Sequence, residues 1–379
     1  MGKIELDHTG SGSGVTLSSD GTDLLLDGTA VGGGGGGAAS ELYAENPSSP
    51  TAPSATGTNA VAIGTSAVAS GLNAMAFGEG STASGDESLA LGDSGAVASN
   101  AVSIGPNAYA AGVSSTSIGV SSDARSTGST AIGYNSQAFT GSNATALTNS
   151  YASGTDSLAA AIGNNTSSYG ATGAYSVAIG RTNKAQSTWS SAIGGSLNIA
   201  SDTGATVTGG YTNTASGLYS RSGGRDAKSD KYGKDAWASG QFSAQGDAQT
   251  GTFVLRSDTT DATPEALTTS NGAAGTTNQI ILPNNSAYAF HGTIVARQQA
   301  SAGTASAAWK VEGLIRREGS AGTTVLVNSA TTVLDNTPSW GMALSADTTN
   351  GGLAITVTGA ASTNIRWVAT IHTSEVIYA

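Results

Sequence analysis

A six-residue pattern recurs along the first half of the chain and constrains the fold more than any other feature. It first occurs as Asn-Ala-Val-Ala-Ile-Gly over residues 59–64 and returns as Asn-Ala-Met-Ala-Phe-Gly over residues 73–78. From Gly64, successive repeat ends follow at steps of 14, 14, 13, 14, 14, 15, 15, 17 and 14 residues up to Gly194, with Thr148 in one glycine position. A weaker alternating run of small residues lies between successive glycines. Each period therefore contains two short alternating segments, each of which ends at a corner.

Alternation over five or six residues is typical of a strand, and helical spacing is absent from these segments. Glycine at the end of each run allows a tight corner. A period near 14 is too short for two ordinary hairpin strands, but it fits one solenoid turn with two short strands. One turn buries almost nothing alone, so neighbouring turns must stack to share a core. The pattern predicts about 13 turns over residues 59–246, and a rod of roughly 60 Å at ~4.8 Å per stacked strand.

Large and small residues alternate within the strongest copies, which separates two faces of each strand. Val61 and Ile63 share one face, and Ala60 and Ala62 share the other. We expect the alanines to form a flat outer face that three identical chains would cover around a fibre axis. We expect the larger residues to fill the interior of each coil, as a repeat core of Val61, Ile63, Phe77, Leu89, Leu91, Val102, Ile104, Ile118, Ile132, Ile162, Ile179 and Ile193.

Two segments precede the repeats. Residues 1–30 contain short apolar runs between turn signals, which predicts a β element too small to be stable alone. We expect this element to dock onto a larger assembly through Ile4, Leu6, Val15, Leu17, Leu24 and Leu26. Residues 31–58 hold six consecutive glycines and then three prolines, a composition typical of a linker.

Residues 249–379 have a different character, because the short repeats give way to longer alternating strands separated by Gly- and Asn-rich turns. This region has the bulky residues needed for an ordinary core, and it predicts an antiparallel β-sandwich or jelly roll. Trp340 and Tyr378 are candidate tip contacts. They could be exposed platforms for sugars, or core or chain-interface residues, and we favour the interface because aromatic residues are enriched there.

Charge and composition exclude several classes of partner. The net charge is −11 and no Lys or Arg lies between Lys3 and Arg125, which argues against a nucleic-acid partner. No apolar run reaches the ~18 residues of a membrane span, the first residues lack the apolar segment of a signal peptide, and there is no cysteine. Five of the 15 basic residues lie between Arg221 and Lys234 among aspartates. A salt-bridged neck is the favoured interpretation, and a site for anionic glycans is the alternative.

Residues suited to catalysis or metal binding are sparse. The three histidines, His8, His291 and His372, fall in different predicted strands, and a structural or surface role is expected for each. Asp86, Glu87 and Asp93 form the nearest carboxylate cluster in the repeats, one repeat apart, so that they could stack. Solvated loop carboxylates are the favoured interpretation. We therefore expect no enzyme activity, no cofactor and no metal site.

The hexapeptide with its Ala-x-Ala-x-Gly follower resembles the head repeats of trimeric autotransporter adhesins, the YadA-like head, over roughly residues 59–200. The resemblance implies a trimeric, left-handed parallel β-roll used in surface adhesion. The flanks lack the heptad stalk and membrane barrel of that family.

Other segments look like phage tail-fibre and virion fibre proteins. They include Val15–Val31 and Gly240–Gln249, with the stretches 257–263, 345–352 and 365–370. This likeness implies a virion protein attached through its N-terminus, with a free C-terminal tip for a host glycan or protein. A capsid head fibre or decoration protein is the alternative, and a polysaccharide-degrading spike is a third.

Overall fold

The computed structural model describes residues 51–160, 168–299 and 305–378, together with the backbone of five short strands among the first 50 residues. The described chain is all-β, with one 3-10 turn at Ala321–Thr323 and no α-helix in these ranges. Two compact units, residues 1–107 and 108–379, divide the chain.

The first unit begins with a four-stranded antiparallel sheet in chain order, which consists of β1 (Ile4–Leu6), β2 (Val15–Ser19), β3 (Leu24–Leu26) and β4 (Thr29–Ala30). Its register pairs Ile4 with Leu17, and Leu17 with Leu26. All six residues predicted to dock this element lie on these strands, and their side chains lie outside the described residues.

The rest of the first unit is a parallel solenoid. One stack holds the three-residue strands β7 (Val61–Ile63), β9 (Met75–Phe77), β11 (Leu89–Leu91) and β13 (Val102–Ile104). The other holds the two-residue strands β6 (Ser54–Ala55), β8 (Val68–Ala69), β10 (Thr82–Ala83) and β12 (Gly95–Ala96). In addition, β5 (Ser40–Leu42) pairs with β7. Both β5 and β6 lie within the stretch expected to be a linker and extend the predicted solenoid at its N-terminal end.

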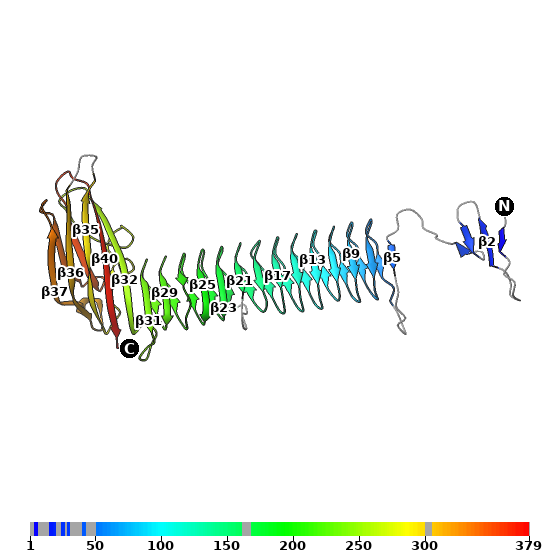
Figure 1. Ribbon diagram of the computed structural model, residues 1–379, viewed down its shortest axis with the longest axis horizontal. Coiled ribbons are helices and arrows are strands. Elements are labelled where there is room, and N and C mark those ends of the chain that lie inside the picture. The colour runs from blue at the N-terminus through cyan, green and yellow to red at the C-terminus, as the bar shows by residue number, and fades with distance from the viewer. Residues whose placement is uncertain are drawn as a thin grey trace. The chain divides into compact units, whose positions relative to one another are not determined.

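The second unit continues with the same two-strand turns. One stack holds β15 (Thr116–Ile118), β17 (Thr130–Ile132), β19 (Thr145–Leu147), β21 (Leu158–Ala160), β23 (Val177–Arg181), β25 (Ser191–Ser196), β27 (Thr206–Val207), β29 (Arg221–Arg225) and β31 (Asp235–Ser239), of which all but β27 are longer than two residues. The two-residue strands are β14 (Tyr109–Ala110), β16 (Asp123–Ala124), β18 (Gln137–Ala138), β20 (Tyr151–Ala152), β22 (Gly170–Ala171), β24 (Lys184–Ala185), β26 (Ile199–Ala200), β28 (Thr214–Ala215) and β30 (Lys228–Ser229). Figure 1 shows these strands stacked turn upon turn from β15 to β31. The prediction of a parallel β-solenoid is confirmed.

The interior of each coil is formed by the small residues and not by the large residues that were predicted to be its core. Ala60 and Ala62 are fully or almost fully buried, whereas Val61 and Ile63 are only half-buried on the outside. Every described member of the predicted repeat core is likewise half-buried or exposed, and Ile162 lies outside the described residues. The physical reason is width: two short strands joined by tight corners approach so closely that only alanine, serine and a few other side chains fit between them.

Each coil turns at residues with a left-handed backbone, which explains the asparagine that opens the hexapeptide. Asn59, Asn73 and Asn100 have φ values of 57°, 56° and 57°. Asparagine tolerates this region better than most residues. The glycine that closes the hexapeptide has the same need, since Gly64 has φ of 118°.

The C-terminal part of the second unit is a two-layer antiparallel sandwich. One sheet has the order β32 (Ala248–Thr259), β40 (Ile365–Ile377), β35 (Ser286–Gln298), β36 (Ser306–Arg317) and β37 (Val325–Asp335). The other contains β33 (Pro264–Ala266), β34 (Ile280–Ile281), β38 (Gly341–Asp347) and β39 (Gly352–Thr358). The predicted antiparallel sandwich is confirmed, and β31 of the solenoid pairs directly with β32 (Figure 1).

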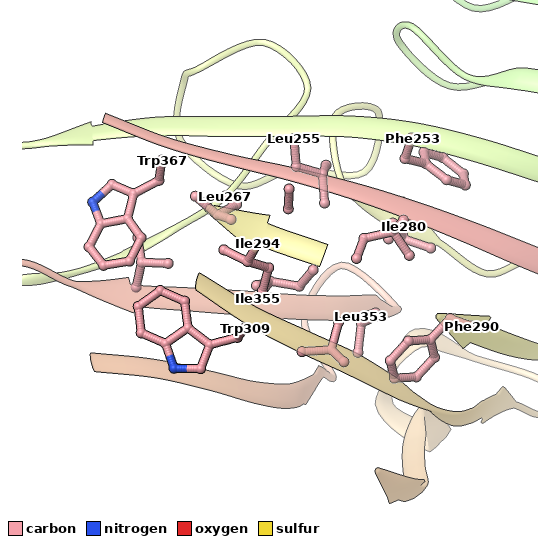
Figure 2. Packing of buried hydrophobic residues seen from close by; sticks show 14 of the residues in the cluster. Phe253, Leu255, Leu267, Ile280, Phe290, Ile294, Trp309, Leu353, Ile355 and Trp367 are labelled. Atoms are coloured by element: carbon pink, nitrogen blue, oxygen red, sulfur yellow. The ribbon is translucent and has the colours of Figure 1, made fainter. Parts of the chain in front are cut away.

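Side chains from both sheets form one apolar core (Figure 2). Phe253, Ile294 and Trp367 come from the five-stranded sheet, and Leu353 and Ile355 face them from β39. The rings of Trp309 and Trp367 stack with centroids 5.8 Å apart. Aromatic contacts of this kind add to the hydrophobic stabilisation of the core.

Candidate docking and recognition surfaces

An apolar ladder covers the outer face of the longer strands. In residues 53–107 its members are Val61, Ile63, Met75, Phe77, Leu89, Leu91, Val102 and Ile104. In residues 108–379 its members are Ile118, Ile132, Leu147, Leu158, Val177, Ile179 and Ile193. Parallel pairing aligns equivalent positions, as Leu89 with Val102 and Leu91 with Ile104. A contiguous apolar surface left half-exposed by one chain marks an interaction face.

The two predicted tip contacts have opposite environments. Trp340 is buried in the sandwich core and its ring packs at 5.8 Å from the ring of Trp367, so the prediction that it contacts a receptor or another chain is wrong. Its indole belongs to the apolar core that the two sheets share. Tyr378 is 85% exposed and borders a hollow of about 310 Å³ with Asn285, Arg316 and Arg317. Tyr378 therefore remains a proposed contact.

Ion pairs organise the neck that joins the solenoid to the sandwich. Arg221 donates from Nε to Asp235 Oδ1 at 3.0 Å, Arg225 pairs with Asp226 at 3.2 Å, and Lys231 pairs with Asp230 at 3.0 Å. The guanidinium of Arg221 lies beside the Asp235 carboxylate and hydrogen-bonds to it, which raises the pKa of Arg221. These pairs agree with the salt-bridged interpretation of the neck rather than with an anionic-glycan site.

Lys234 belongs to the same basic segment but is buried, which the sequence interpretation missed. Its Nζ lies 2.7 Å from Glu375 Oε2 of β40, and Gln249 donates to the same oxygen at 2.7 Å. The same carboxylate also affects Tyr288. Burial of the Tyr288 phenol, together with the nearby charge of Glu375, raises the pKa of Tyr288 well above 10. The sequence contained one signal of this burial. Lys234 directly follows the corner residue Gly233, just as Ser220 directly follows the corner residue Tyr219, and Ser220 is buried.

The carboxylates considered for catalysis do not converge. Asp86 accepts a hydrogen bond from the Leu72 backbone N–H at one corner of its turn, whereas Asp93 follows β11 at the other corner. Glycosidic chemistry needs two carboxyl groups within a few ångströms of each other. No group of three metal-ligating side chains occurs in the described part of the chain.

Two histidines that the sequence assigned to separate strands lie side by side in the structure. His291 and His372 are direct cross-strand partners on the exposed face of the five-stranded sheet, with ring centroids 5.4 Å apart. Thr252 Oγ1 lies 3.1 Å from His372 Nδ1. These exposed positions agree with the expected surface role, and His8 lies outside the described residues.

The fold defines a class of protein: a parallel β-solenoid with a core of small residues that leads into an antiparallel sandwich. Five segments match the family described as YadA head domain repeat (2 copies), at residues 55–78, 69–94, 96–122, 124–147 and 171–196. The repeats are therefore of the YadA-like, adhesin type. Comparison with curated proteins gave no match. No helix among the described residues is long and apolar enough to cross a membrane.

One similar solved structure is the tailspike protein gp49 from Acinetobacter baumannii bacteriophage Fri1, a capsular polysaccharide depolymerase. The identity is 10%, the TM-score is 0.21, and the alignment covers 57% of this chain and 39% of the tailspike.

Proposed function

We propose that the chain forms a homotrimeric fibre of a phage virion that contacts the surface of the host cell. The apolar ladder is the observation that carries this proposal. Apolar side chains recur at equivalent positions on one face from β7 to β25, as Val61, Met75 and Leu89 do, and a single chain leaves that face partly in water. A closed symmetric assembly removes such a face from water in every copy at once, and three copies around an axis suit a fibre.

The proposed interface differs from the one expected from the sequence. The alanine face was expected to contact sister chains, but it is the coil interior. The Val, Ile and Leu face takes over that role. The small-residue interior makes each turn thin, and the outer ladder supplies the apolar area that stabilises the assembled fibre.

In this proposal the two ends of the chain bind different partners. The N-terminal sheet of β1 to β4 binds another virion protein, and the C-terminal sandwich is the tip that contacts a host glycan or protein. Three tips on one fibre give avidity even when each contact is weak. Exposed Tyr378 is the proposed contact of this domain, and it lies at the end of β40 next to the solenoid, where the Ile377 N–H donates to the Asp247 carbonyl.

Antibodies against the sandwich test the proposal on intact virions. We expect immunogold label at the outer ends of tail fibres, and Fab fragments of these antibodies should block adsorption to host cells. Label on the capsid without loss of adsorption would instead support a head fibre or decoration protein. Release of sugars from host polysaccharide by the purified chain would contradict the non-enzymatic assignment.

A further inference from the structure

One corner of the solenoid carries exposed aromatic side chains in the second unit. They are Tyr175, Trp189 and Tyr219, and each lies at the corner immediately before the first buried residue of its turn. The three residues are between 51% and 58% exposed. All three have a left-handed backbone, with φ values of 56°, 58° and 54°. Bulky residues rarely adopt this conformation, and three at equivalent positions are a pattern.

Backbone hydrogen bonds hold these residues in register along the solenoid. The Trp189 N–H donates to the Ala174 carbonyl at 2.9 Å, and the Tyr219 N–H donates to the Thr203 carbonyl at 2.9 Å. The corner between them is Gly204, whose N–H donates to the Thr188 carbonyl at 3.0 Å. Successive turns are therefore spaced by about one strand separation, ~4.8 Å. The row formed by Tyr175, Trp189 and Tyr219 spans about three such steps.

Gly204 completes the row rather than interrupting it. A Cβ atom on this residue would overlap the ring of Tyr219, so the ring lies over the glycine. The edge of the Tyr219 ring also packs against Tyr232, with centroids 5.8 Å apart. Tyr219 is thus held in a fixed orientation while half of its surface stays exposed.

The backbone of these corners does not require an aromatic side chain. Elsewhere the same corner uses residues that suit its backbone and bond to one another, since Asn59 donates to Asn73 at 3.2 Å and Asn143 donates to Asp156 at 2.9 Å. An aromatic residue gives up these bonds, accepts backbone strain and exposes apolar surface. Strain repeated at a surface position points to a function that uses the rings.

We propose that the row of Tyr175, Trp189 and Tyr219 binds an extended, neutral polysaccharide that lies along the solenoid axis. A polysaccharide is itself periodic, and the apolar C–H face of each pyranose ring stacks on an aromatic ring. Tyrosine and tryptophan combine an apolar face with a polar tip, which suits such a ligand.

The charges around the row favour a neutral ligand. The cations within two residues of these corners, or of the next corner at Gly233, are Arg221, Lys231 and Lys234. Arg221 and Lys231 are paired with aspartates, and Lys234 is buried against Glu375. Recognition of acidic sugars would use cations directed at the ligand. The site also lies on the side of the solenoid, so it is distinct from the tip contact in the proposed function.

Affinity electrophoresis of the full chain in gels that contain neutral glucan, galactan or mannan tests the inference, with polygalacturonate as the acidic comparison. The variants are Tyr175→Asn, Trp189→Asn and Tyr219→Asn, because asparagine is the residue that the solenoid uses at this corner. Tyr134→Asn is the matched control, since Tyr134 is 63% exposed at the opposite corner. Sedimentation of each variant checks its assembly.

We expect retardation by at least one neutral polymer, a loss of about threefold to tenfold in affinity for each single variant, and complete loss in the triple variant. Affinity for the matching oligosaccharides should rise with length until they span the row. Three results would overturn the proposal: no neutral polymer retards the wild-type chain, the triple variant binds like the wild type, or the triple variant falls apart into smaller species because the rings join copies. Polymer binding without adsorption to cells would contradict the proposed function alone.

Discussion

Lys234 and Glu375 form a buried ion pair across 141 residues, with Nζ 2.7 Å from Oε2. Lys234 stands at the position where preceding turns bury small residues such as Ala205 and Ser220. The last turn thus ends the solenoid core with a charge, and β40 of the sandwich supplies the opposite charge. Thr373 also donates to Glu375 at 2.7 Å, so the carboxylate is well satisfied. The contact joins solenoid and sandwich into one packed structure within the second unit.

Lys234→Met should destabilise this junction by about 3–5 kcal/mol, because the buried Glu375 carboxylate loses its partner. The double variant Lys234→Met with Glu375→Leu should recover most of that loss, since no buried charge is left. Denaturant unfolding followed by tryptophan fluorescence of the sandwich measures the effect. The exposed Arg221–Asp235 pair is the control, and Arg221→Gln should cost at most about 1 kcal/mol. Equal effects of the two single variants would show that burial of the pair is unimportant.

Asp247 predicts a specific dependence of stability on pH. Burial acts to raise the pKa of Asp247, but backbone N–H groups of Ala244, Ser243 and Phe242 donate to its carboxylate and together lower it. A carboxyl group whose pKa is lower in the folded state than in the unfolded state stabilises the fold. This stabilisation is complete above the unfolded-state pKa of about 4 and is lost as the pH falls through the folded-state pKa. Asp247→Asn should therefore cost about 1–2 kcal/mol at neutral pH and progressively less as the solution becomes more acidic than about pH 4.

Thermal unfolding of Asp247→Asn and wild type at neutral pH and at about pH 2.5 measures this difference. Exposed Asp93 provides the control, and Asp93→Asn should change stability little at either pH. A difference between Asp247→Asn and wild type that is the same at both pH values would contradict the role of the charged carboxylate.

The sequence predicted the architecture because its strongest signals are local. Alternation identified the strands, and a repeat length that holds only two short strands identified the solenoid. It did not predict which face is inside. Alternation separates Val61 from Ala62 but leaves their direction open, and the usual preference for burying the larger residue fails in a coil this narrow. The cross-section of the coil decides the outcome, and that cross-section is a property of the assembled turns.

Contacts between distant segments were beyond the sequence for a similar reason. Lys234 meets Glu375, and His291 meets His372, only after the strands of the sandwich have adopted their register. The aromatic corner is different. Tyr175 and Trp189 each stand immediately before a serine at a buried position, in the place held by Asn59 in the first hexapeptide. The substitution was visible in the sequence, but its exposure and backbone strain were not.

A buried asparagine ladder predicts local stability in the second unit. Asn183, Asn198 and Asn213 are buried in successive turns, and the Asn213 N–H donates to Asn198 Oδ1 at 3.0 Å. Asn198 Nδ2 also donates to the carbonyl groups of Gly194 and Gly210. Asn198→Ala leaves these groups without partners and should cost about 2–4 kcal/mol.

Because a solenoid opens locally, the effect should be concentrated in the neighbouring turns. Hydrogen exchange should quicken at the amide of Asn213, which donates to Asn198 Oδ1 in the wild type. Asn143→Ala at an exposed corner is the control and should leave this rate unchanged. Unchanged protection of the Asn213 amide in Asn198→Ala would show that the ladder does not stabilise these turns.

The apolar ladder predicts which substitutions dissolve the assembled fibre. Leu91 lies on the ladder between Phe77 and Ile104, which pair with it in the neighbouring turns. Leu91→Glu would place a carboxylate in the proposed interface between sister chains, and burial of unpaired like charges around an axis is strongly unfavourable. The coil itself should stay folded, because position 91 points out of it. We therefore expect the wild type to sediment as a trimer and Leu91→Glu as a folded monomer.

Val68 of β8 is the control, half-buried on the other outer face, and Val68→Glu should remain trimeric. A monomeric wild type would contradict the proposed assembly, and loss of the trimer in Val68→Glu alone would move the interface to the other face.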